Sequence, residues 1–587
     1  MKYFFLAVFF IICVFSITYD NTAQACCPKG MITIPKPPPP PPPPEVAPPI
    51  STPGPKGPPL PLPTGNPKPI PEPTPSPAPD TPTNEPAATS TAVRIQWQTW
   101  WETNKDKYLD YHKAFPKDAL ETNPDGTTAQ SKQLVDLKRF FENELTNSTY
   151  SIRLAIAIAI GRTGDGSYAA ALKKNTADSE REVRDYTTLG LGMIKDTGSI
   201  QQLSDILLNS KGHTISRGIS AYALGFTRDP KALEILKKVL DSREERDDTL
   251  YACTIALGLF KDPALNDYLK NILVPKKSKD DLPYKRAYAA LALGRIGGDE
   301  AADILINAIA KEKNIEVLRA ISIALGMTGN PKAKKALAAM IDKSNDELVK
   351  GFAVIALAQL KTDDGYEIIL PYAMDKRYED FRGFAVLSLG ILGDKKAGSE
   401  LKKIMADKRA SESVKTAAIL AMGLLGAKEY STDILEIAKS QTELESKRCF
   451  AAISIGLMGD KANVPALKEI FENSAFAFDL YRDSALALAL LGENKMVLEK
   501  MYKDYDEKPA YVKAIALGVF GSIGDKETVS FVLARYEKED NKSMKLLMIT
   551  ALGYLADPNR MSVLKELTAD NNYQIKFLSI DHITAIP

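Results

Sequence analysis

One pattern of hydrophobic and polar positions recurs from about residue 131 to the end of the chain. Each copy contains an amphipathic segment, a polar turn and a nearly all-apolar segment that ends at a small residue. Because their apolar positions have helical spacing, the two segments predict two helices, and strand signals are lacking. The small residues are 31 to 33 positions apart, except for one longer step to Gly294. They are Gly161, Gly192, Gly225, Gly258, Gly294, Gly326, Ala358, Gly390, Gly423, Gly456, Ala489, Gly521 and Gly553.

Helix boundary signals agree with this division. An Asp usually follows four positions after the small residue, as in Asp229, and it is expected to cap the first helix, here Pro230 to Leu240. The same role is predicted for Asp262, Asp394, Asp460 and Asp525. The second helix runs into glycine, which adopts the left-handed conformation that ends helices. A period kept through thirteen copies predicts an all-α fold, an α-solenoid of about 13 two-helix repeats spanning residues 131–587.

A basic residue recurs near the start of the second helix, seven or eight positions before the small residue, and only Leu250 breaks this column. We predict that the column joins acidic residues of the turns in an Asp–Arg ladder between neighbouring repeats, rather than forming a phosphate-binding stripe. The ladder residues expected are Arg184, Arg217, Arg286, Arg382, Asp241, Asp342, Asp375 and Asp407.

The Asp-capped first helix, the basic column and endings such as Leu389-Gly390-Ile391-Leu392-Gly393-Asp394 resemble the short bacterial HEAT repeats of phycobilin lyase-like proteins. The resemblance covers Ser131 to about Ile586 and implies that the second helices line a concave surface. The segment Trp97 to Asn104 is similar to the tryptophan-rich lead-in of secreted HEAT-repeat proteins. All three tryptophans lie in this segment, however, and we favour the simpler explanation that residues 91–130 form a tryptophan-rich N-terminal cap over the open end of the solenoid.

Many second helices are apolar almost all round, which indicates burial. Apolar residues five positions after the basic residue have two explanations. Either the solenoid curls tightly and buries them, or they line an apolar concave groove for a partner helix or peptide, centred on the repeats of Leu387, Leu420 and Ile453. Burial of these side chains decides between the two. The six candidate partner-binding residues are Tyr222, Leu291, Ile355, Leu387, Leu420 and Ile453.

The first ninety residues predict export. Residues 1–25 read as a signal peptide, with an apolar run followed by Ala23-Gln24-Ala25. An uncleaved anchor and lipidation of Cys26 are open alternatives, and either would tether the N-terminus to a membrane or the cell surface. Residues 26–90 are proline-rich and are predicted to form a disordered linker. The expected location is the periplasm, the cell envelope or the extracellular medium. Cys253 and Cys449 are predicted to be buried core residues.

Charge and composition argue against several function classes. Lys plus Arg total 75 and Asp plus Glu total 74, so no net charge favours nucleic acid. Three scattered histidines and the lack of a His-Glu pair argue against the iron site of the HEAT-type hydroxylase. No nucleophile elbow or P-loop is present. We assign no catalytic, metal or cofactor-binding residue and expect a non-enzymatic interaction scaffold with a protein or peptide partner. The alternative is a lyase-like catalytic or cofactor-handling protein whose site is not visible in the sequence.

Overall fold

The computed structural model describes residues 96–109, 111, 121–122, 128–129, 132–242, 245, 247–276, 282–474 and 477–557. All of these lie in one compact unit that includes residues 95–587. The predicted signal peptide and linker, Cys26, most of residues 112–131, and the last residues of the predicted solenoid lie outside the described residues.

Thirteen helix pairs follow one another through residues 132–556, as the repeat spacing predicts. The first helices are α3 (Lys132–Asn147), α5 (Ala169–Asn175), α7 (Ile200–Leu208), α9 (Pro230–Leu240), α11 (Asn266–Leu273), α13 (Gly298–Ile309), α15 (Lys334–Lys343), α17 (Gly365–Met374), α19 (Ala397–Ala406), α21 (Ser431–Lys439), α23 (Val464–Asn473), α25 (Asn494–Asp504) and α27 (Lys526–Tyr536). The second helices are α4 (Tyr150–Thr163), α6 (Arg181–Met193), α8 (Thr214–Thr227), α10 (Asp247–Phe260), α12 (Pro283–Ile296), α14 (Ile315–Thr328), α16 (Glu347–Gln359), α18 (Glu379–Leu392), α20 (Glu412–Leu425), α22 (Glu445–Met458), α24 (Phe478–Leu490), α26 (Ala510–Ile523) and α28 (Lys542–Ala556).

The caps predicted from sequence form. Asp229 accepts a hydrogen bond from Lys231 N–H at 2.8 Å, and Asp525 closes a capping box with Thr528 at 2.9 Å. Asp262, Asp394 and Asp460 bind backbone N–H groups in the same way. Left-handed glycines end several second helices, for example Gly393 at φ 83°. These caps fix where each helix begins and ends, and so fix the repeat length.

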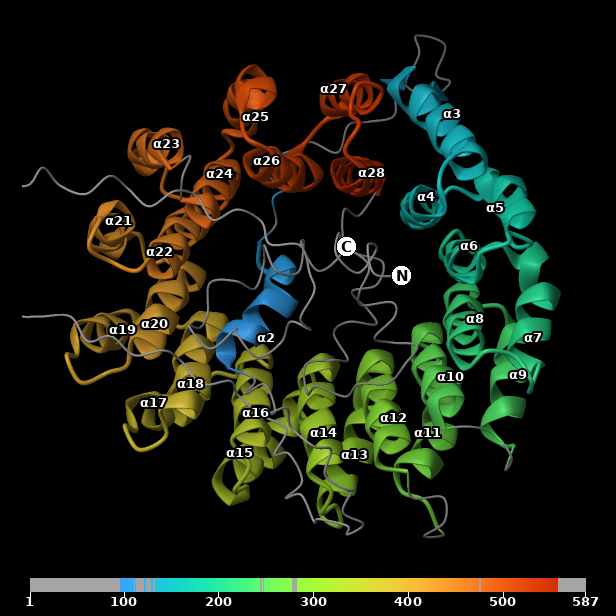
Figure 1. Cartoon of the computed structure of the whole chain (residues 1–587). Coiled ribbons are helices and arrows are strands. Elements are labelled where there is room, and N and C mark those ends of the chain that lie inside the picture. The colour runs from blue at the N-terminus through green and yellow to red at the C-terminus, as the bar shows by residue number, and fades with distance from the viewer. Residues whose placement is uncertain are drawn as a thin grey trace, which may run out of the picture. The chain divides into compact units, whose positions relative to one another are not determined.

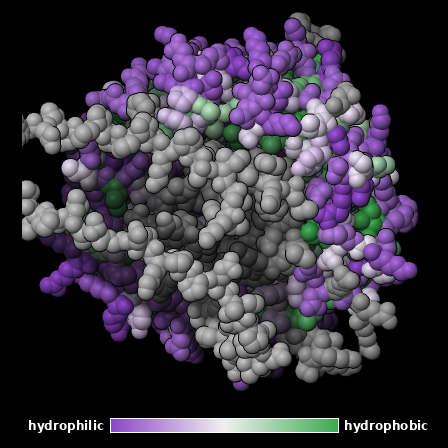
Figure 2. All heavy atoms as spheres, viewed as in Figure 1, coloured by the Kyte–Doolittle hydropathy of each residue, from purple (hydrophilic) through white to green (hydrophobic). Residues whose placement is uncertain are grey.

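The second helices form the inner layer and the first helices the outer layer (Figure 1). Each second helix packs against the second helix of the next repeat. The column of small residues makes this packing possible. A Cβ on Gly390 of α18 would lie 2.5 Å from Ala421 Cα of α20, so the two backbones are in direct contact. Hydrophilic residues cover most of the coloured surface in Figure 2, as expected for amphipathic outer helices.

The last repeat packs against the first, so the repeats close into a ring (Figure 1). Helix α28 contacts α4 as neighbouring second helices contact each other, and a Cβ on Gly553 would lie 3.1 Å from Ala159 Cα. In the outer layer, the Tyr536 hydroxyl donates to Glu144 Oε2 at 2.7 Å. The Arg162 guanidinium lies 3.9 Å from the ring centroid of Tyr554. The sequence pattern had predicted an open solenoid, and the closed seam is a new finding.

Among the described residues, two short strands, a 3-10 helix (Lys105–Lys107) and helix α2 precede the repeats. The strands β1 (Glu121–Thr122) and β2 (Thr128–Ala129) form a short antiparallel pair, which no strand pattern in the sequence predicted. The helix α2 (Trp97–Asn104) carries all three tryptophans and lies inside the ring (Figure 1). The prediction that it caps an open end is wrong, because the end that it would cover is already covered by α28.

Candidate binding surface on the inner helices

The six side chains predicted to line an apolar groove are buried. Tyr222, Leu387 and Leu420 are 0% exposed, and Leu291, Ile355 and Ile453 are at most 6% exposed. They therefore do not form an open docking surface, and their assignment as partner-binding residues is corrected here. Small residues such as Gly390 draw adjacent second helices into backbone contact, which leaves no open space between them. Of the two explanations, tight curling accounts for these side chains.

The inner surface of α18, α20 and α22 nevertheless receives a helix, which is the chain's own α2. The Trp97 ring lies directly over Gly383 of α18, where a Cβ would come within 2.4 Å of Trp97 Cδ1. The ring also packs against Phe450 of α22, with 5.4 Å between the centroids. Because Gly383 has no side chain, α18 leaves room for an indole at this position.

Two hydrogen bonds fix the orientation of α2. The Trp97 indole N–H donates to Ser413 Oγ at 3.0 Å, and the Gln98 amide donates to the same oxygen at 2.8 Å. Ser413 lies in the first turn of α20. A hydroxyl oxygen has two lone pairs, so one serine can accept from both side chains. The contact therefore combines an apolar recess with a specific polar anchor.

The chain continues from α2 along the same inner surface, and we call its described residues, 97–109 and 111, the strap. Trp101 stacks on Tyr108 with 5.7 Å between centroids, and Trp100 is 4% exposed. The Tyr108 hydroxyl bonds with Gln359 of α16, and burial raises the pKa of Tyr108 despite that bond. At the far end, Tyr111 is buried near Asp483 of α24. The strap thus reaches from α16 to α24, across five consecutive second helices.

A charged cluster on α24 lies at the end of the strap. Arg482 pairs with Asp479 at 3.0 Å and with Asp483 at 2.7 Å. Burial raises the pKa of Asp479 to about 6, while the Arg482 charge opposes this shift. Burial alone would lower the pKa of Arg482, but Asp483 and Asp479 raise it, and the Glu102 carboxylate of the strap adds to this effect. The strap therefore contributes charge as well as apolar surface to this cluster.

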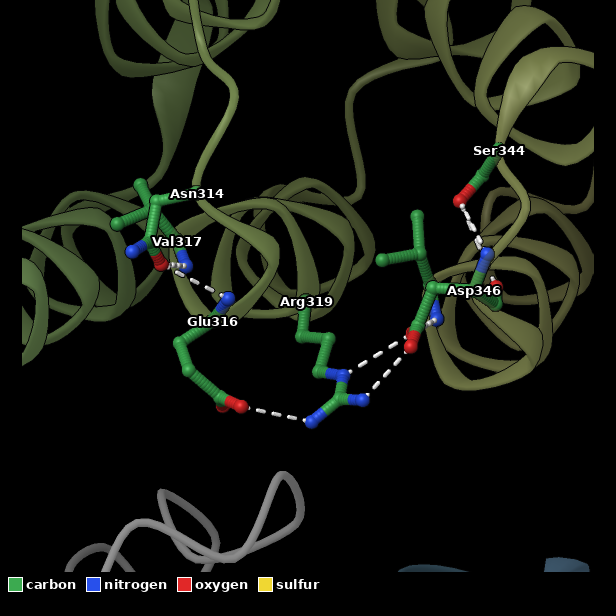
Figure 3. Close-up of polar contacts among 7 residues, drawn as sticks. Asn314, Glu316, Val317, Arg319, Ser344 and Asp346 are labelled. Carbon is green, nitrogen blue, oxygen red and sulfur yellow. Dashed lines mark hydrogen bonds and ion pairs between the residues drawn. The ribbon is translucent and has the colours of Figure 1, made fainter.

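The ladder between repeats exists, with acids other than those predicted. Arg319 of α14 binds Asp346 before α16 through two hydrogen bonds of 3.0 and 2.7 Å, and Glu316 binds the same guanidinium at 2.8 Å (Figure 3). Equivalent pairs are Arg153 with Asp178, Arg217 with Glu245, and Arg286 with Glu312. The Arg217 and Arg286 side chains also donate to the last carbonyls of their own first helices, both at 2.8 Å. Arg217 and Arg286 therefore join the two helices of their own repeat to the next repeat.

The four predicted ladder acids bind other partners. Asp241 and Asp342 accept from the hydroxyls of Tyr268 and Tyr372, whereas Asp375 pairs with Arg377 and Asp407 with Lys376. These aspartates lie at the ends of first helices, in the outer layer. The acid next to the arginine instead lies in the turn, one to three residues before the next second helix begins, and sequence spacing alone does not distinguish it from the acid at the end of the first helix.

Two of the predicted ladder arginines also act within their own repeats. Arg184 donates to the backbone oxygens of Asp178 and Ser179 at 2.6 and 3.0 Å. Arg382 is 1% exposed, pairs with Glu379 at 3.0 Å and donates to the Ala373 carbonyl at 2.9 Å. Both therefore hold the turn between the two helices of one repeat.

Among the described residues, the cysteines and the possible metal ligands provide no further candidate site. Cys253 and Cys449 are free and buried, as predicted, and burial raises the pKa of both thiols. Within the described part of the chain, no group of three His, Cys, Asp or Glu residues is arranged to hold a metal ion. The described helices include none that is both long and apolar enough to cross a membrane.

Comparison with known families agrees with the repeat geometry. Residues 272–358 and 343–423 match the family model for HEAT repeats. Residues 272–423 therefore contain HEAT repeats. No curated protein matches this sequence.

Several solved HEAT-type structures are similar to parts of the chain. Human deoxyhypusine hydroxylase is 18% identical, with a TM-score of 0.21, over 44% of this chain and 96% of the hydroxylase. The phycocyanin lyase complex of CpcE and CpcF from Nostoc sp. is 22% identical, with a TM-score of 0.27, over 44% of this chain and 93% of the lyase chain. Importin beta is 14% identical, with a TM-score of 0.38, over 61% of this chain and 59% of its own.

The residues that form the strap contact were not singled out as binding residues from the sequence. Gly383, Ser413 and Phe450 belong to no motif in the sequence. The one signal was the concentration of tryptophan outside the repeats, because three large aromatic side chains require a surface to bury them.

Proposed function

We propose that this protein is a non-enzymatic interaction scaffold that binds a protein or peptide partner on the inner surface of its HEAT ring. The proposal rests on the contacts that hold the strap against the inner helices. A segment outside the repeats lies across five second helices there, with its indole in a recess and two hydrogen bonds to one hydroxyl. A surface that accepts a segment by these contacts has the properties of a peptide-binding surface.

The charged side chains support the same proposal. The charged side chains of the ladder bind one another or backbone carbonyls between neighbouring helices, and this role is structural. The raised pKa of Asp479 is accounted for by its burial beside Arg482. We therefore propose no catalytic residue.

Export belongs to the same proposal and rests on the first 25 residues of the sequence. Mass spectrometry of the protein from its source cells tests it directly. A mature chain that begins after Ala25, recovered from the envelope or the medium, supports export. A chain that retains Met1 to Ala25 in the cytoplasm contradicts it.

The partner is tested by affinity capture with the full chain as bait, followed by hydrogen exchange on the purified complex. We expect one or a few proteins to be enriched and protection to concentrate on inner helices such as α18 to α22. Protection confined to the outer first helices would contradict the use of the inner surface. A bound chromophore or other cofactor on the purified protein, with no protein partner, would favour the lyase-like alternative.

A further inference from the structure

The strap resembles a bound ligand more than a part of the ring. The second helices contact one another through the small-residue column around the whole ring, including the seam, and the strap contributes nothing to these contacts. Helix α2 has eight residues and no side-chain cap. A helix this short is not stable alone in water, so α2 depends on its contacts with α18, α20 and α22 to stay helical.

The recess formed by Gly383, Ser413 and Phe450 fits a particular kind of side chain. The glycine at position 383 makes room for a flat ring, and Phe450 packs against one side of it. Ser413 accepts from an indole N–H and from an adjacent side-chain amide. Three and four residues further along α2, Trp100 and Trp101 are buried as well, at 4% and 2% exposure. The complementary ligand is therefore a short helix with Trp, a neighbouring amide side chain, and aromatic residues one turn later.

We propose that the inner surface of α18, α20 and α22 binds in trans a partner helix of this tryptophan-bearing kind, and that the strap competes with it in cis. This inference rests on the proposed function and specifies the chemistry of its partner. The strap itself is the argument for the occupant, because it shows which side chains the recess around Gly383 accepts. A segment of the same chain competes at an effective concentration of up to about mM, so partner binding requires displacement of the strap.

The experiment uses the full chain and a fluorescein-labelled peptide of residues 95–111 of this protein. The double variant Trp97→Ala, Gln98→Ala removes the indole and both donors to Ser413. We expect the peptide to bind this variant at least about 10-fold more tightly than the wild type, because the cis competitor is weakened. A peptide with all three tryptophans replaced by alanine is expected to show no saturable binding.

A third substitution locates the site. Gly383→Leu in the double variant fills the recess, and we expect it to abolish peptide binding. Gly518→Leu is the matched control, because Gly518 lies in α26 and neither the strap nor any neighbouring helix has an atom within 4 Å of its Cβ position. Binding that withstands Gly383→Leu, or that is lost equally with Gly518→Leu, overturns the proposal.

Hydrogen exchange on the wild-type chain gives an independent measurement. A strap that competes with a partner must open without the ring, so its amides are expected to exchange faster than those of α18 to α22. Exchange of the strap only together with these helices overturns the proposal, as does unfolding of the ring in the double variant, since the strap would then belong to the core.

The two proposals fail in different ways. A captured partner whose binding is unaffected by Gly383→Leu leaves the scaffold function in place and overturns the inference about its chemistry.

Discussion

At the scale of single residues, position relative to the helix start decides what an acidic side chain does. Asp346 lies before α16 and performs two tasks, since it caps that helix through Val349 N–H at 2.8 Å and binds Arg319 of the preceding repeat. Asp342, four residues earlier, lies exposed at the end of α15 and binds the Tyr372 hydroxyl. The same residue type on two sides of one turn therefore has different structural importance.

We predict that Asp346→Ala lowers the free energy of unfolding by about 2–3 kcal/mol, because it removes a cap and leaves Arg319 with one acidic partner fewer. The matched control Asp342→Ala is expected to cost less than about 1 kcal/mol, since it loses one exposed hydrogen bond. Urea unfolding of both variants at pH 7 measures the difference. Equal losses would contradict a special role for the acid at the helix start.

The loss of stability caused by Asp346→Ala is expected to depend on pH. Burial would raise the pKa of Asp346, but Arg319 and the backbone N–H of Val349 hold it below its ordinary value. Its stabilising contribution is thus complete above the unfolded pKa of about 3.9 and is lost as the pH falls through the lower folded value. We expect the destabilisation by Asp346→Ala to be largest at neutral pH and to shrink in strongly acidic solution.

At the scale of helices, small residues determine how closely the inner layer packs. Gly390 in α18 faces the backbone of Ala421, whereas Gly518 in α26 has no neighbouring atom near its Cβ position. Both are glycines inside helices, where the residue alone is unfavourable by about 0.5–1 kcal/mol relative to alanine. Only at Gly390 does a contact compensate for that cost.

We predict opposite effects for one substitution at these two positions. Gly390→Ala forces α18 and α20 apart and is expected to destabilise the protein by about 1–3 kcal/mol. Gly518→Ala is expected to stabilise it by about 0.5–1 kcal/mol through helix propensity. Chemical unfolding of the two variants tests this, and a loss of stability at both positions would contradict the open environment of Gly518.

At the scale of the whole unit, the sequence predicts the repeats but neither the closure nor the place of the strap. The spacing from Gly161 to Gly553 correctly gives thirteen helix pairs, because each repeat is determined locally by caps and apolar faces. Closure depends on small rotations summed over all repeats, and no local pattern records that sum. The strap has no period, so Trp97 gave evidence of burial without indicating Gly383 as its partner.

The closed ring makes a prediction about two residues that are 392 positions apart. The Tyr536 hydroxyl donates to Glu144 across the seam, and the Phe140 ring packs edge-on against Tyr536 with 4.7 Å between centroids. A double-mutant cycle with Tyr536→Phe and Glu144→Ala is expected to give a coupling of about 1 kcal/mol, as for a hydrogen bond between adjacent groups. The control cycle joins Tyr268 and Asp241, which make the same kind of bond at 2.8 Å between neighbouring repeats.

A coupling near zero at the seam, with a normal value in the control, would mean that the first and last repeats do not meet in solution. A coupling similar to the control would mean that the seam is an ordinary interface between repeats, and that every repeat in the ring has two neighbours.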